Sequence, residues 1–210
     1  MIDGDLSPRE SLELIRDQQQ GAARHLYPDP VRLLAVWGVT WLAGFGACYL
    51  ASSGARWHVV PGWVAGLLLG VGIVLSASYV AWHVARRGRG VQGPSRTAEA
   101  AYGWCWLLAF AGVFALDIGL TRAGLPPRLA PLLWPGTSAV VAGVMYLAGG
   151  LLFGDRVQFG LGGWMLAVGA GSVFAGWPAN FAVLALAGGG GFLAAATLSW
   201  FGSRPATETS

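Results

Sequence analysis

Asp117 is the acidic side chain that lies well inside a long apolar segment, so it is the first residue of this chain that could do chemistry. A carboxyl group is costly to bury in a membrane, and such residues often bind a substrate or relay a proton. Asp117 lies five residues before Arg122, near the end of its segment. It could therefore reach water instead, or pair with Arg122 or Arg128, and both interpretations stay open.

Four consecutive glycines in the apolar run 184–196 are the second such feature. They are Gly188, Gly189, Gly190 and Gly191. A helix that unwinds in mid-membrane exposes backbone groups that bind substrates or ions, as in transporters. Glycines also let two helices approach closely. The sequence favours close packing, because no proline interrupts the middle of any segment and a matching break in the third segment would have only Gly112.

Small residues recur at every fourth position in the last two apolar segments, on both sides of a short connection near 177–180. In the fifth segment they are Gly163, Ala167, Gly171 and Ala175. In the sixth segment they are Ala187, Gly191 and Ala195. The short connection makes the two segments antiparallel neighbours, so we expect these two stripes to touch backbone to backbone. The second segment has the same spacing at Gly62, Gly66 and Gly70.

Composition indicates a membrane protein, since 55% of the 210 residues are apolar and only 11% are charged, against about 25% charged in soluble domains. The apolar residues gather in six segments, each near the ~20 residues that cross a bilayer as a helix. The segments are Leu33–Ala51, Val59–His83, Ala101–Thr121, Leu129–Phe153, Val157–Pro178 and Phe181–Trp200. Because a backbone in lipid must satisfy its own hydrogen bonds, we predict an all-α bundle of six transmembrane helices.

The chain is therefore divided into an N-terminal segment 1–30, a transmembrane domain 31–202 and a tail 203–210. Ser7 to Glu10 forms a capping box that predicts a short helix before the membrane. Its apolar stripe either lies against the bundle and the lipid headgroups or docks a cytoplasmic protein partner. The stripe consists of Leu12, Ile15, Ala22 and Leu26. The first thirty residues are polar, so we expect no cleavable signal peptide.

Arginine distribution predicts the orientation, because cytoplasmic loops carry an excess of basic residues. With the N-terminus in the cytoplasm, Arg56, Arg122 and Arg128 lie outside and the other ten of the thirteen basic residues lie inside. Both termini are then cytoplasmic. The loop after the second segment is rich in arginine and can contact anionic lipid. A net charge of +3 gives no indication of nucleic-acid binding.

The sequence predicts no metal site, no cofactor and no catalytic residues. His25, His58 and His83 lie in different parts of the predicted topology and do not converge. The glycines of 88–93 match the spacing of a dinucleotide-binding loop. That motif needs a strand, a turn and a helix, and this stretch follows a membrane helix instead. We therefore reject it.

Two stretches, ESLELIRDQQQGAARHLYPDPVRLLAVWGVTWLAGFG and FGDRVQFGLGGWMLAVGAGSVFAG, together with the glycine-rich last segment, resemble a group of uncharacterised six-span bacterial integral membrane proteins. Some members of that group are labelled as transporters. The resemblance implies a six-helix fold in the inner membrane of a bacterium, and it implies no site residues.

Three functions stay open at this stage. A small transporter or permease-like component needs a polar cavity near Asp117 or 188–191. A non-catalytic scaffold or regulator, which binds a protein partner or a second copy, needs a closed, dry bundle. An intramembrane enzyme needs clustered polar groups, of which this chain has few, so we expect that it is not an enzyme.

Overall fold

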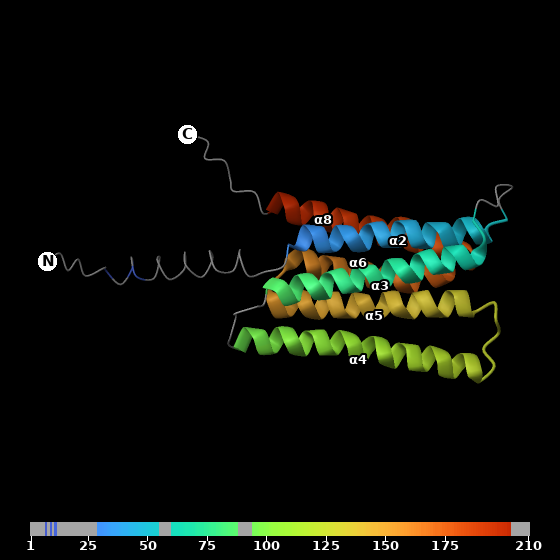
Figure 1. Cartoon of the computed structure of the whole chain (residues 1–210), viewed down its shortest axis with the longest axis horizontal. Coiled ribbons are helices and arrows are strands. Elements are labelled where there is room, and N and C mark those ends of the chain that lie inside the picture. The colour runs from blue at the N-terminus through green and yellow to red at the C-terminus, as the bar shows by residue number, and fades with distance from the viewer. Residues whose placement is uncertain are drawn as a thin grey trace.

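The structure is a computed structural model that describes Ser7, Arg9, Ser11 and residues 29–54, 60–87 and 94–202. These residues form an all-α bundle in which six helices are long and apolar enough to cross a membrane (Figure 1). The elements are α2 (Pro30–Ser52), α3 (Gly62–Arg87), α4 (Pro94–Arg122), α5 (Ala130–Phe153), α6 (Arg156–Phe174), α7 (Ala179–Val183), the π-helical segment η1 (Leu184–Gly189) and α8 (Gly190–Gly202). The predicted fold class is confirmed.

The predicted N-terminal helix lies largely outside the described residues. Within them, the Ser11 N–H donates to the Ser7 carbonyl at 2.9 Å, which is the spacing of one helical turn. The fifth predicted segment is longer than its helix, because α6 ends at Phe174 and a turn through Gly176, whose φ is +70°, leads to α7.

Local signals in the sequence explain where several helices begin and end. Asp29 precedes α2, and its carboxylate accepts a hydrogen bond from the Val31 N–H at 3.1 Å. Asp155 precedes α6 and accepts from the N–H groups of Val157 and Gln158 at 2.8 and 3.0 Å. Gly154 ends α5 with a φ of +68°, a conformation that favours glycine. This short connection makes α5 and α6 an antiparallel hairpin.

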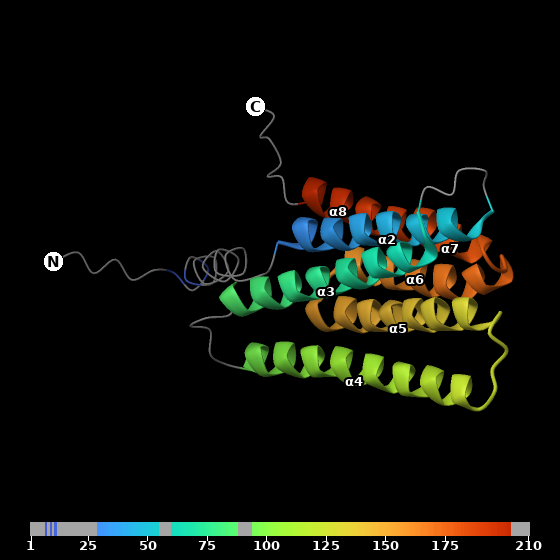
Figure 2. The ribbon, with the colours of Figure 1, turned by 45° about the vertical axis from the view of Figure 1, so that its right-hand side comes forward.

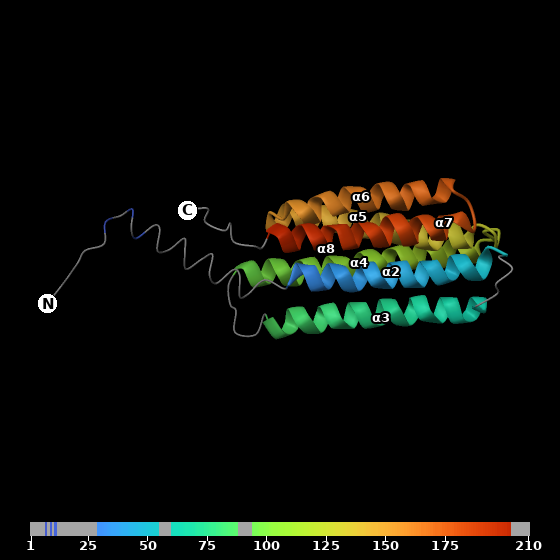
Figure 3. The ribbon, with the colours of Figure 1, turned by 90° about the horizontal axis from the view of Figure 1, so that it is seen from above.

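Helices α2, α5, α6 and α8 form the centre of the bundle, and α3 and α4 lie at its edges (Figures 1 and 2). α3 packs on α2, and α4 packs on α5. Figure 3 shows α3 on the side of the bundle away from α6. α2 begins and α8 ends at the same end of the bundle, which we call the terminal end, and we call the other the opposite end.

The core is apolar and aromatic. Met165 and Leu184 are fully buried, and Phe192 is 1% exposed. Trp41 packs edge-on against Phe192, with ring centroids 5.5 Å apart. Trp41 and Phe192 thus join α2 to α8 at the centre of the bundle, where the glycine run also lies.

Candidate functional site

Asp117 lies on α4, faces α5 and is fully buried. Its Oδ2 accepts a hydrogen bond from Thr137 Oγ1 at 3.0 Å, and its Oδ1 has no hydrogen-bond partner within the described chain. Thr137 Oγ1 also lies 2.8 Å from the Leu133 carbonyl of its own helix. A hydroxyl has one proton to donate, so Asp117 shares its donor with a backbone carbonyl.

The expected pairing of Asp117 with Arg122 or Arg128 is not the contact that the structure makes. Both arginines are exposed, and the ion pair found between described residues joins Arg32 to Asp29. Five residues along an α-helix correspond to a rotation of roughly 140° from the starting side chain. Arg122 therefore points away from the α4–α5 contact while Asp117 points into it, and the carboxyl group does not reach water.

Tyr102 makes the second polar contact of α4, and it was not among the residues predicted from the sequence. Its hydroxyl donates to the Met145 carbonyl at 2.7 Å and accepts from Gln158 Nε2 at 3.2 Å. A Cβ at Gly149 would collide with Tyr102 and Gln158, so glycine is needed there. Gln158 lies just inside the fifth predicted apolar segment, where its amide requires a hydrogen-bond partner, and this was the signal in the sequence that pointed to the contact. Tyr102 and Asp117 together orient α4 on α5.

Asn180, at the start of α7, was also missed. It is fully buried, and its Nδ2 donates to the Pro131 carbonyl at 2.7 Å. Pro135 lies inside α5 and has no N–H to donate to the carbonyl four residues earlier. The carbonyl that lacks a helical partner is that of Pro131, and Asn180 supplies the missing donor. A proline inside an apolar segment was the available signal.

The four glycines lie in a continuous helix that contains a π-helical segment, and three of them are explained by neighbouring side chains and backbone. A Cβ at Gly188 would lie 2.7 Å from Trp41 Cε3, and one at Gly189 would lie 3.0 Å from the Gly38 carbonyl oxygen. A Cβ at Gly191 would lie 2.5 Å from Trp164 Cδ1. The Trp164 Nε1–H also donates to the Ala187 carbonyl at 2.8 Å. The glycines thus leave room for the α2 backbone and for the indole rings of Trp41 and Trp164.

The expected contact between the two small-residue stripes is not made. The stripe of Gly163, Ala167, Gly171 and Ala175 is exposed along α6. Ala187, Gly191 and Ala195 are partly or fully buried, and Gly191 faces Trp164 rather than a glycine. Added Cβ atoms at Gly62, Gly66 and Gly70 would also meet nothing within 4 Å.

The close backbone approach joins α5 to α6 instead. A Cβ at Gly143 would lie 2.9 Å from the Gly162 carbonyl oxygen, and one at Gly169 would lie 2.9 Å from the Val140 nitrogen. These glycines recur at seven-residue spacing, which also includes Gly136 and Gly150 on α5. A seven-residue repeat keeps one seam facing a partner helix that crosses at a small angle.

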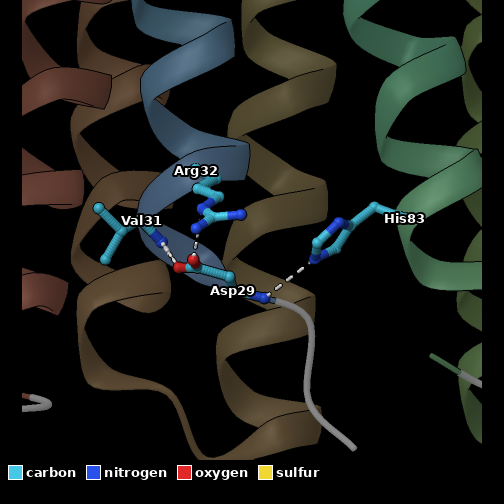
Figure 4. A network of polar contacts seen from close by, with 4 residues as sticks. All are labelled: Asp29, Val31, Arg32 and His83. Carbon is cyan, nitrogen blue, oxygen red and sulfur yellow. Dashed lines mark hydrogen bonds and ion pairs between the residues drawn. The ribbon is translucent and has the colours of Figure 1, made fainter. Parts of the chain in front are cut away.

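At the terminal end, a polar cluster joins the start of α2 to the end of α3 (Figure 4). The Arg32 Nε lies 3.1 Å from Asp29 Oδ2, and the Asp29 N–H donates to His83 Nε2 at 3.4 Å. The sequence places His83 at the end of its segment, and only the fold brings it beside Asp29.

Two grooves open between the helices. The larger, of about 460 Å³, lies between α2 and α3 and is lined by Ala35, Val36, Val39, Thr40, Gly72, Leu75, Ser76 and Tyr79. The smaller, of about 200 Å³, lies near the opposite end and is lined in part by Cys48, Gly62, Pro131 and Trp177. Neither is lined by Asp117 or by residues 188–191. Among the described residues, no group of three His, Cys, Asp or Glu side chains could hold a metal ion.

Comparisons of this chain with protein-family models, with curated proteins and with solved structures find no match. The class of protein follows from its helices, because six of them are long and apolar enough to span a bilayer. The chain is a multi-pass membrane protein. The resemblance noted from the sequence is thus supported in its six-span architecture, and no family is identified.

Proposed function

We propose that this protein is a non-catalytic membrane scaffold or regulator that binds another membrane protein. One observation carries the proposal: the residues with the best claim to transport chemistry are engaged in contacts between helices. Asp117 contacts Thr137, and Gly188, Gly189 and Gly191 accept side chains and backbone of α2 and α6. Neither of the two grooves described above is lined by these residues. Their engagement between helices supports a scaffold rather than a transporter.

The uncovered apolar surface of α3 supports the same proposal. Of its apolar segment 11% is buried, which lies between 6% for α4 and 39% for α5 and for the last helix. Gly62, Gly66 and Gly70 of α3 are open positions, and Gly62 and Gly66 border the smaller groove. Small residues at four-residue spacing allow close approach of a second transmembrane helix. The N-terminal helix, which was the docking element expected from the sequence, lies outside the described residues.

Gly66→Leu tests this proposal. A Cβ at Gly66 meets nothing within 4 Å, so the free energy of unfolding should fall by no more than about 0.5 kcal/mol. A partner helix seated on the glycines would be displaced, and we expect at least a tenfold loss of the protein that co-purifies in mild detergent at a fixed stoichiometry. Gly103→Leu is the matched control, because Gly103 is equally open but lies on α4. Equal recovery of the partner with both variants would exclude α3 as the binding face.

We further propose that the terminal end faces the cytoplasm of a bacterial inner membrane. Arg32, Arg86 and Arg156 lie at that end, and Arg122 and Arg128 lie at the opposite end. The excess of arginine at the terminal end is what the positive-inside rule expects of the cytoplasmic side. A reporter enzyme that is active only outside the cytoplasm, fused after Ser210, should be inactive, and its activity would contradict this orientation.

Transport through Asp117 is a second candidate function, favoured by the buried Oδ1 that lacks a partner. Asp117→Asn separates the two functions, because the amide keeps the size of the carboxyl group but cannot relay a proton. We expect vesicles with wild-type protein and with this variant to have equal proton permeability, measured with an internal pH-sensitive dye. Thr197→Val is the control, because it removes a hydroxyl that donates to the Leu193 carbonyl of its own helix. A proton flux that the wild type supports and Asp117→Asn abolishes would favour transport.

A further inference from the structure

The α2/α3 groove, defined by the eight lining residues given above, continues at the terminal end into a basic region. On α2, Arg32 precedes Ala35, Val36, Val39 and Thr40 at spacings of three, four, seven and eight residues, which place all five on one face. Arg32 is held at its Nε by Asp29, and its side chain remains 69% exposed. Figure 4 shows Arg32 on the side of α2 toward α3.

The facing side of α3 has the same order of residues. Gly72, Leu75, Ser76 and Tyr79 line the groove, and Trp82, His83 and Arg86 follow on the same face. The guanidinium carbon of Arg86 lies 4.9 Å from the centre of the Trp82 ring, a geometry in which the cation stacks on the indole. Two arginines from different helices therefore border the end of one groove.

The walls of the groove are apolar, and the contact between Thr40 and Ser76 closes its floor. Thr40 and Ser76 satisfy each other through a hydrogen bond of 2.7 Å, and Ser76 is only 2% exposed. A Cβ at Gly72 would lie 3.0 Å from Thr40, so α2 and α3 are close at that level. Val39 and Leu75 remain 59% and 64% exposed at the rim. The groove thus offers apolar contact along its length and positive charge at one end.

We propose that the α2/α3 groove binds one anionic phospholipid, with an acyl chain between the two helices and the phosphate at Arg32 and Arg86. Basic pockets between transmembrane helices recognise anionic headgroups in this manner. The Asp29 carboxylate is the opposing charge in this cluster, and it is engaged by Arg32 Nε and the Val31 N–H. A free phosphate would use the arginines but not the groove. A second helix along the groove would cover its apolar residues but bring no charge to the arginines.

The experiment measures lipid retained by the full chain in mild detergent, using native mass spectrometry. Phosphatidylglycerol and phosphatidylcholine with identical acyl chains are titrated separately, and glycerol 3-phosphate is added as a soluble competitor. We expect one phosphatidylglycerol to bind more tightly than phosphatidylcholine and to resist the competitor. Equal affinity for the two lipids, or displacement by glycerol 3-phosphate at equal concentration, would overturn the proposal.

Charge variants locate the headgroup. Replacing both Arg32 and Arg86 by glutamine should weaken phosphatidylglycerol binding about fivefold for each arginine removed, with no change for phosphatidylcholine. The control replaces Arg122 and Arg128 by glutamine. Both arginines are exposed at the opposite end, and the control variant has the same change in net charge. An equal loss of affinity in both double variants would mean that net charge alone attracts the lipid, and the site would be refuted.

A filling variant locates the acyl chain. Val39→Trp places an indole in the groove from an exposed position, and we expect it to abolish retention of the tightly bound lipid. Val74→Trp on α3, a position 63% exposed and outside the groove lining, should leave retention unchanged. Retention of the lipid by Val39→Trp would overturn the proposal. The proposal would also be overturned if light scattering showed that the wild type is a dimer and Val39→Trp a monomer, because a second copy would then occupy the groove.

Discussion

Replacing Gly169 by leucine is expected to lower the free energy of unfolding by about 3 kcal/mol. The added Cβ would lie 2.9 Å from the Val140 nitrogen and 2.9 Å from the Ala139 Cβ. The Val140 nitrogen belongs to the α5 backbone, which cannot move without separating the two helices. Separation removes the dispersion contacts that hold transmembrane helices together, and no hydrophobic force replaces them in lipid.

Gly171→Leu is the matched control, on the same helix and only two residues away. A Cβ at Gly171 meets nothing within 4 Å, so we expect stability to fall by no more than about 0.5 kcal/mol. Both variants are compared by unfolding purified protein in mixed micelles with increasing sodium dodecyl sulfate, followed by circular dichroism. Similar losses would mean that α6 presents a different face to α5 from the one described above.

Replacing Gly189 by alanine should lower the free energy of unfolding by about 1–3 kcal/mol. The Cβ would lie 2.9 Å from the Leu42 nitrogen and 3.0 Å from the Gly38 carbonyl oxygen, both in the α2 backbone. One methyl group is enough here because the neighbouring atoms belong to a helix rather than to a flexible side chain. The same unfolding titration measures the effect.

Gly190→Ala separates close packing from a need for helix flexibility. Gly190 is the adjacent residue, and its Cβ would meet nothing within 4 Å. Alanine favours helix over glycine by about 1 kcal/mol, so this variant should be as stable as the wild type or more stable. The glycines would serve as a hinge instead of a contact surface if Gly189→Ala left stability intact and Gly190→Ala reduced the recovery of the co-purifying partner or the proton flux.

The buried polar contacts could be predicted only in part from the sequence. Asp117 stood out because a carboxyl group in an apolar segment has to be accommodated. Its partner Thr137 lies twenty residues away on the next helix, and the rotation of α4 about its own axis decides which of its faces meets α5. His83 and Asp29 are fifty-four residues apart, so their contact depends on how α2 and α3 pair. Asn180 could be found only by asking which carbonyl Pro135 leaves without a donor.

The sequence by itself determined that the chain is a membrane protein with six helices, because length and apolar composition decide whether a segment can cross a bilayer. It also determined that glycines would mark close approaches. Only the tertiary structure decided which glycines those are. Four-residue spacing places small residues on one face, but it does not say whether that face meets a helix or lipid, and both are apolar. Gly163 and Gly171 are exposed while Gly162 and Gly169 face α5, because the rotation of α6 about its own axis decides which of its glycines meet the α5 backbone.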